Sequence, residues 1–212
     1  MLKIDSVHVT IASVQALRGF SLEVAEGSMV SLVGRNGAGK TSLMRTVMGH
    51  LQPGGGSVHF EGVNLANVAR HARAGLGIGY MPEDRGLVPE LTVEENILVP
   101  VWASKTLKGE ERLKLVYEIL PELREIRTRS ALLLSGGQQK MAALARALAV
   151  GTRLLLLDEP FEGLAPALSQ RLSEVVAALR GTKLSVLISQ SDLNHSRSLV
   201  DREVVIERGA NA

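Results

Sequence analysis

The segment GRNGAGKT at residues 34–41 constrains this chain more than any other feature. It matches the pattern G-x-x-x-x-G-K-[ST] at every specified position, with a strand-like run before it and a helix-like run after it. In this context the glycines let backbone N–H groups point at phosphate oxygens, and the following helix adds its positive dipole end. Lys40 supplies a charge for the β- and γ-phosphates, and Thr41 supplies a hydroxyl for Mg²⁺. The residues expected to bind nucleotide here are Gly34, Arg35, Asn36, Gly37, Ala38, Gly39, Lys40, Thr41 and Ser42.

A second motif, LLLLDEP at 154–160, supplies acids at the end of an apolar run. An acid in this position can hold Mg²⁺, usually through water, and Asp158 fits that role. Glu159, one residue later, could orient or deprotonate an attacking water. Alone, the two acids could equally cap a helix, but together with the phosphate loop they indicate a hydrolytic site.

The stretch LSGGQQK at 134–140 precedes a helix-like run and offers a second anion site. The residues expected to contact phosphate are Ser135, Gly136, Gly137 and Gln138. A local alternative is that Ser135 only caps the helix. One chain cannot easily bring both anion sites to one nucleotide if they lie on different parts of the domain. Two chains placed head to tail can, with each chain closing the other's site.

Strand-like and helix-like runs alternate along the chain, which predicts an α/β fold with a largely parallel central sheet. The almost wholly apolar run RLLLLDEP at 153–160 is typical of a central strand covered on both faces. Residues 86–131 carry more charge and show helical spacing, so they are expected to form a helical insertion. We therefore predict one domain, with 1–85 and 132–212 as the catalytic core and 86–131 as a helical subdomain.

Composition excludes several classes of protein. The 212 residues include 24 basic and 22 acidic side chains, a balance that does not argue for nucleic acid binding. There is no cysteine, so disulfides and thiolate metal sites are excluded. The sequence has no apolar window of about 18 residues that could span a membrane, and its first residues do not resemble a signal peptide. A cytosolic chain is expected, with any membrane role exerted through a partner.

The order of the motifs, phosphate loop, then LSGGQ, then LLLLDEP, resembles the nucleotide-binding subunit of ATP-binding-cassette (ABC) transporters over essentially the whole chain. That resemblance implies a phosphate-loop fold with an N-terminal antiparallel β part and an inserted helical subdomain. It also implies ATP and Mg²⁺ as ligands, a dimer that sandwiches two ATP molecules, and contact of residues 135–138 with the partner's γ-phosphate. The segments YMPEDRG, LTVEENI and LLLLDEPFEGLAP are similar to the ATPases of branched-chain amino-acid importers and their urea- and amide-transporting relatives.

Three positions depart from the general pattern of the family. Glu83 stands where a Gln is usual; its carboxylate can still bind Mg²⁺, and with Arg85 it is expected beside the surface that couples to the membrane subunits. Gln190 stands where a His usually hydrogen-bonds the γ-phosphate; its amide can donate that bond but cannot take a proton. Ile11 stands where an aromatic usually stacks on adenine, so about 1 kcal/mol of stacking is lost. Nearby His195 is expected to be a surface residue.

The resemblance implies an ATP-hydrolysing importer subunit, peripheral on the cytoplasmic face of the membrane. Glu159, Lys40 and Gln190 are expected to serve catalysis, and Thr41, Asp158 and Glu83 to bind the metal. Its expected partners are a second ATPase chain and two transmembrane permease subunits, with a solute-binding protein acting indirectly. A heterodimer is expected in the transporter, with a homodimer possible in isolation, and family members usually run on past the last strand. The alternatives are a non-hydrolysing regulatory half or, less in keeping with the length, a nucleic-acid-associated ABC ATPase.

Two further features are expected to be structural. The run ANVARHARAG at 66–75 is read as a short helix whose basic side chains face solvent. Trp102, the only tryptophan, is expected to serve packing.

Overall fold

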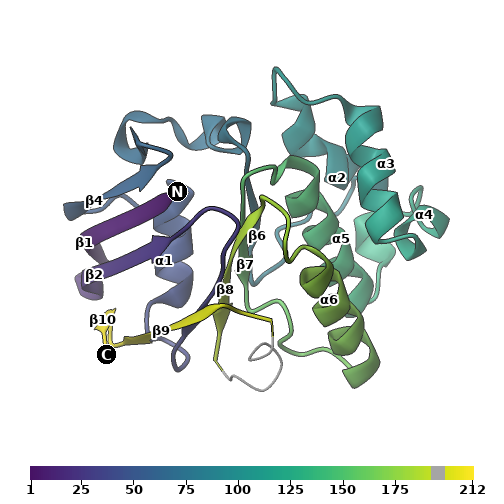
Figure 1. Cartoon of the computed structure of the whole chain (residues 1–212). Helices are drawn as coiled ribbons and strands as arrows, with labels where there is room; N and C mark the ends of the chain where they lie inside the picture. Colours follow the sequence, from purple (N-terminus) through teal and green to yellow (C-terminus); the bar gives the residue numbers. More distant parts are fainter. Residues whose placement is uncertain (192–198) are drawn as a thin grey trace.

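The computed structural model describes residues 1–191 and 199–212, and the first part of the fold is an antiparallel sheet (Figure 1). Its strands lie in the order β2-β1-β4-β5. Their bounds are β1 Leu2–Ile11, β2 Val14–Val24, β4 Gly55–Phe60 and β5 Val63–Asn64. Buried side chains alternate along β1, as expected of a strand with one face on a core.

A second sheet holds the described strands in the order β10-β9-β3-β8-β7-β6, and every pair in it is parallel except β10 with β9. Their bounds are β3 Met29–Val33, β6 Ile78–Met81, β7 Leu154–Asp158, β8 Ser185–Gln190, β9 Arg202–Glu207 and β10 Ala210–Asn211. All five residues of β7 are buried, which confirms the prediction of a central strand covered on both faces. The α/β fold class predicted from the sequence is confirmed.

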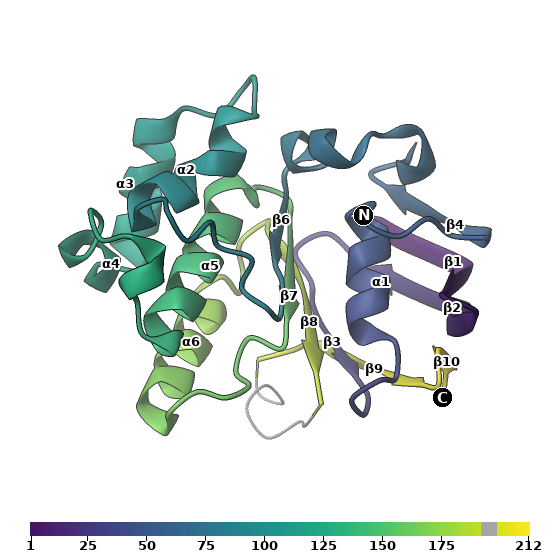
Figure 2. The same ribbon diagram turned by 180° about the vertical axis from the view of Figure 1, so that it is seen from behind.

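Helices cover both faces of the parallel sheet. The α-helices in the described residues are α1 Lys40–Val47, α2 Val93–Trp102, α3 Gly109–Ile119, α4 Glu122–Glu125, α5 Gly136–Val150 and α6 Pro166–Ala178. Helix α1 lies on one side of strands β6 to β8, and α5 and α6 lie on the other (Figures 1 and 2). None of these helices is long and apolar enough to cross a membrane.

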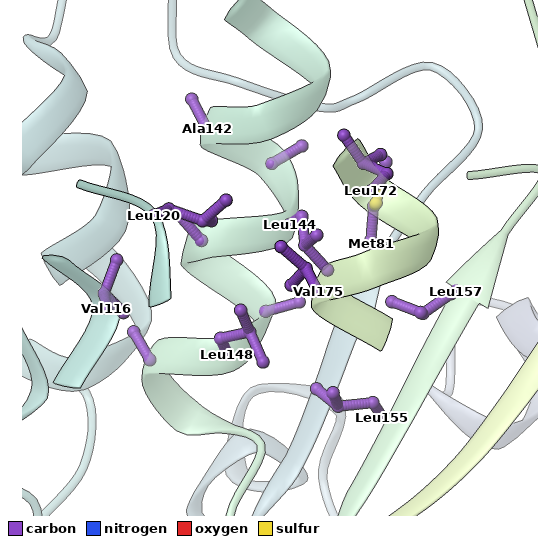
Figure 3. Packing of buried hydrophobic residues seen from close by; sticks show 14 of the residues in the cluster. Met81, Val116, Leu120, Ala142, Leu144, Leu148, Leu155, Leu157, Leu172 and Val175 are labelled. Atoms are coloured by element: carbon purple, nitrogen blue, oxygen red, sulfur yellow. The ribbon is translucent and has the colours of Figure 1, made fainter. Parts of the chain in front are cut away.

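Two apolar cores result from the alternation of side chains along the strands. Leu154 and Leu156 of β7 pack with α1 and the antiparallel sheet, whereas Leu155 and Leu157 pack with α5 and α6. The second core continues from the sheet through α5 to α2, α3 and α4, so the helical insertion shares one core with the sheet (Figure 3). This packing fixes the position of α5, and with it the LSGGQ segment, relative to the carboxyl end of β7.

The prediction of a helix over residues 66–75 is wrong, although two of the three basic side chains there are exposed as expected. They form no α-helix; three short 3-10 turns span 65–67, 70–72 and 74–76. Arg73 is buried rather than solvated, and its guanidinium donates to the carbonyls of Thr46 and Val47 at the end of α1. A cation at this position stabilises the carbonyls that the helix leaves unpaired. The prediction for Trp102 is also wrong, since its side chain is 61% exposed at the end of α2.

Candidate functional site

The phosphate loop follows β3 and leads into α1, as the motif requires. Two of its glycines are enforced by close neighbours: a Cβ on Gly34 would come within 2.4 Å of the Ile206 carbonyl oxygen, and one on Gly39 within 2.6 Å of the Ala16 carbonyl oxygen. Gly39 also has a φ of 112°, which L side chains rarely adopt. The start of β2 and the end of β9 therefore enclose the loop and fix its shape.

Lys40 is almost fully buried within the loop. Its Nζ donates to the carbonyl oxygens of Gly34 at 2.5 Å and Arg35 at 3.2 Å, and lies 3.1 Å from the Glu159 Oε1 atom. A buried ammonium needs partners of this kind, because desolvation of an unpaired charge is costly. The structure thus joins the phosphate-loop lysine directly to the second acid of LLLLDEP.

Asp158 and Glu159 are held at the end of β7 by two serines that the sequence analysis did not identify. Ser189 Oγ donates to Asp158 Oδ1 at 2.5 Å and accepts from the Glu159 backbone N–H at 3.1 Å. The Ser191 N–H donates to Glu159 Oε2 at 3.1 Å. A signal for Ser189 was available, since this serine directly follows the apolar residues 186–188 at the end of a predicted strand.

The backbone of Glu159 is in a left-handed conformation, with a φ of 47°. A non-glycine residue in this region costs about 1–3 kcal/mol and persists only where its surroundings hold it. Lys140 of α5 supplies part of that hold: its Nζ donates to the Glu159 carbonyl at 2.8 Å and to the Glu162 carbonyl. The turn that carries Glu159 is therefore held between Ser189 on the sheet and Lys140 on α5.

Burial raises the pKa of both acids above the ordinary carboxyl value. For Asp158 the hydrogen bond from Ser189 opposes that rise, and for Glu159 the hydrogen bond and charge of Lys40 oppose it. Burial also lowers the pKa of Lys140, because its ammonium is desolvated. A carboxylate with a raised pKa is a stronger base, which suits the removal of a proton from water.

A magnesium ion fits the residues that converge beside these acids. The Thr41 hydroxyl donates to Glu83 Oε2 at 3.3 Å, and the negative charge of Glu83 raises the pKa of Asp158. Asp158 Oδ2 is buried and has no hydrogen-bond partner among the described residues. Three or more His, Asp or Glu side chains do not cluster anywhere in the described chain, but Mg²⁺ needs only one or two carboxylates when phosphates supply other oxygens.

Two further residues predicted for this site, Gln190 and Ile11, lie in the described chain. Gln190 is buried at the end of β8, and its backbone carbonyl accepts from the Gly34 N–H at 3.1 Å. Ile11 lies at the end of β1, in the hairpin that leads into β2. His195 lies outside the described residues.

The LSGGQ segment is separate from the phosphate loop within the chain. Ser135 caps α5 in a reciprocal pair: its Oγ accepts from the Gln138 N–H at 3.3 Å, and its N–H donates to Gln138 Oε1 at 3.0 Å. In the described parts of the chain no hydrogen bond or ion pair joins 135–138 to 34–42. The structure brings Lys40, Thr41, Glu83, Asp158 and Glu159 together, and leaves 135–138 out of that group.

A cavity of about 750 Å³ is lined by Thr41 and Glu83 and by residues of helices α2 and α5. Arg146 of α5 contributes to its wall and donates to the carbonyls of Gly86 and Arg85, both at 2.6 Å. Arg85 in turn donates to Gln139 at 2.7 Å. The loop that carries Glu83 is thus fastened to the helix that begins at the LSGGQ segment.

Comparison with known proteins gives one consistent family. Residues 17–162 match the family model described as ABC transporter. The chain is 36% identical over 209 residues to the high-affinity branched-chain amino acid transport ATP-binding protein BraG of Pseudomonas aeruginosa, covering 99% of this chain and 90% of that protein.

Other relatives have different named roles. The lipopolysaccharide export system ATP-binding protein LptB of Escherichia coli K12 is 31% identical, over 89% of this chain and 79% of that protein. Among solved structures, the dimeric structure of MJ0796, a bacterial ABC transporter cassette, superimposes with a TM-score of 0.88 at 25% identity. That match covers all of this chain and 96% of the other.

Proposed function

The chain belongs to the ABC transporter ATP-binding family, and from that premise we propose that it drives the import of branched-chain amino acids or related small solutes. It is an ATPase subunit of a transporter. The importer assignment rests on its similarity to BraG over nearly the whole chain, and on the segments YMPEDRG and FEGLAP. The weaker similarity to LptB, a protein of an export system, makes export the second candidate.

Each residue in the site has a proposed part in hydrolysis. The loop amides and Lys40 hold the β- and γ-phosphates, and Gln190 donates to the γ-phosphate. Glu159 orients a water molecule and takes its proton as the water oxygen attacks the γ-phosphorus. The bond from that phosphorus to the β–γ bridging oxygen breaks, and ADP and phosphate leave.

Thr41, Asp158 and Glu83 are the residues that would hold Mg²⁺. When bound, the ion supplies positive charge that neutralises the phosphate oxygens. The unpartnered Asp158 Oδ2 and the neighbouring Thr41 hydroxyl support this assignment.

The chain works as a head-to-tail dimer in which residues 135–138 of one protomer close the ATP site of the other. The observation that carries this proposal is the separation of two phosphate-binding segments within one chain. In the transporter the second chain is a different ATPase, and an isolated homodimer forms by the same contacts. Two permease subunits dock on the cytoplasmic face, at the cavity beside Glu83 and Arg146, and a solute-binding protein acts through them.

The rival function within the family is a non-hydrolysing regulatory half, suggested by Ile11, Glu83 and Gln190. The pairing of Lys40 with Glu159 argues for the hydrolysing form, because both side chains are present and Lys40 Nζ lies 3.1 Å from Glu159 Oε1.

The test is steady-state Mg²⁺-ATPase activity as a function of protein concentration, with Glu159→Gln as the matched variant. We expect the rate per chain to climb with concentration. The variant should lose at least about 10²-fold in rate and accumulate ATP-dependent dimers. A rate per chain independent of concentration would contradict the dimer, and ATP binding without hydrolysis in the wild type would favour the regulatory half.

A further inference from the structure

The loop after β6 carries an arginine that lies against the first turn of α5. A Cβ built on Gly136, the first residue of that helix, would stand 3.4 Å from Arg85 Nη2 and 3.8 Å from its Cζ. Arg85 Nη1 donates to Gln139 Oε1 at 2.7 Å, three residues further along α5. The guanidinium therefore lies beside the same helix end that carries residues 135–138.

This arginine is held in place from its backbone outward. Its φ is 68°, a left-handed conformation that a residue with a side chain keeps only where its neighbours hold it. Arg146 of α5 supplies such a hold, because it donates to the carbonyls of Arg85 and Gly86, both at 2.6 Å. Gln139 is fixed in turn, since its Nε2 donates to two carbonyls of the turn before α5, at 3.4 and 3.3 Å.

The charge of Arg85 has no counter-ion within the described chain. Neither Arg85 nor Lys140 forms an ion pair with a carboxylate there. Burial lowers the pKa of Lys140, and the charge of Arg85 lowers it further against an opposing effect of Glu162, so the two cations lie close together. A cation at a helix N-terminus also opposes the positive end of the helix dipole. An anion bound at this place would make the arrangement favourable.

Several donors at this end of α5 meet no acceptor of the chain. Arg85 Nη2 makes no hydrogen bond to any described residue. The backbone N–H groups of Gly136 and Gly137 also lack an acceptor in that part of the chain. A guanidinium together with free amides at a helix start is a donor set that binds phosphate.

We propose that Arg85 is a further catalytic residue, which donates from Nη2 to the γ-phosphate of the ATP bound to a second copy of this chain. This inference rests on the proposed head-to-tail dimer, in which residues 135–138 meet that phosphate. The guanidinium keeps its protons and stabilises the charge on the γ-phosphate oxygens as the bond to the bridging oxygen breaks. Glu83, only two residues earlier, accepts from Thr41 of the chain's own phosphate loop, so one short loop serves two ATP molecules.

The first test mixes Arg85→Gln with Lys40→Met and measures Mg²⁺-ATPase rates at a concentration where the wild type is dimeric. Arg85→Gln alone should lose at least about tenfold in rate. In a mixed dimer the intact Lys40 of one chain and the intact Arg85 of the other meet at one ATP. The mixture should therefore run faster than the mean of the two variants alone, whereas an arginine that serves its own chain's ATP would leave it at that mean.

Salt dependence separates a contact with phosphate from a purely structural role. Dimerisation with MgATP is measured by sedimentation equilibrium over a series of potassium chloride concentrations, in a Glu159→Gln parent. Adding Arg85→Gln should flatten the dependence on salt, because a screened charge contact is gone. A change that only displaced α5 would weaken the dimer equally at every salt concentration.

Two further variants serve as controls. Arg85→Lys keeps the charge without the planar fork, so it should retain the salt dependence and more of the rate than Arg85→Gln. Arg124→Gln removes an exposed charge from α4 of the same subdomain and should change neither the rate nor the salt dependence.

A mixture at the mean, or salt dependences that coincide for the parent and the Arg85→Gln variant, overturns the role of Arg85 alone. The reference is a mixture of Ser135→Ala with Lys40→Met. If that mixture also stays at its mean, the head-to-tail dimer is overturned, and the role of Arg85 with it. Far-UV circular dichroism and thermal midpoints close to the parent's identify the losses as losses of function rather than of folding.

Discussion

The phosphate loop and the segment 132–138 are both proposed to bind nucleotide, but only the phosphate loop is bonded to other parts of the site within the chain. Lys40 is buried and bonded to two loop carbonyls and to Glu159. Segment 132–138 has a local cap at Ser135 and projects two exposed leucines. The comparison shows that the first is a finished site within one chain, whereas the second is an exposed surface, as the proposed head-to-tail dimer requires.

Lys40→Met should have the largest effect, because it removes the centre of the finished site. Hydrolysis should fall at least about 10²-fold. The free energy of unfolding should fall by about 3 kcal/mol, because Glu159 is left buried without its cation. Urea denaturation and ATPase assays measure the two losses.

The double variant Lys40→Met, Glu159→Gln is the control for that loss. With both charges gone, most of the stability should return while activity stays absent. Stability losses that simply add in the double variant would show that the two side chains are not coupled in the fold.

Ser135→Ala should have a smaller effect on hydrolysis, and mixing this variant with Lys40→Met should restore part of the rate. The lost cap costs about 1 kcal/mol of stability, and hydrolysis slows because the partner's nucleotide is less well closed. Mixing this variant with Lys40→Met should give a rate above the mean of the two alone, since each mixed dimer keeps one site with both halves intact. A rate equal to that mean would place both segments on one nucleotide within one chain.

The pH dependence of stability should show the smallest effect. Because burial raises the pKa of Glu159 in the folded state, the folded protein holds that proton more tightly than the unfolded chain. Its contribution to stability is then greatest below the unfolded pKa and declines as pH rises through the folded pKa. Unfolding curves of wild type and Glu159→Gln should therefore diverge in favour of the variant as pH rises. Parallel curves would contradict the raised pKa.

Sequence patterns predicted the parts of the fold that depend on periodicity. The apolar run at β7 was confirmed as a buried strand, because its signal lies within one element. The environment of Arg73 and the exposure of Trp102 were not predicted, because both depend on which elements meet in space. Arg73 is buried on the end of α1, and no local pattern in residues 66–75 records that neighbour.

The candidate site, like the fold, was predicted only in part from the sequence. Motif spacing predicted the grouping of Lys40, Thr41 and Asp158, since each stands at the end of a recognisable strand or loop. Ser189 and Lys140 were missed as supports of Glu159, because their contacts join elements distant in the sequence.

The two hydrogen bonds from Lys140 to the turn that carries Glu159 have a consequence for cooperativity. Helix α5 begins with Ser135, which in the proposed dimer meets the partner's ATP, and its Lys140 holds the turn that carries the chain's own Glu159. A shift of α5 toward one nucleotide therefore reaches the groups that serve the other. The two ATP sites of such a dimer are energetically linked, so that ATP bound at one site changes the affinity of the other site.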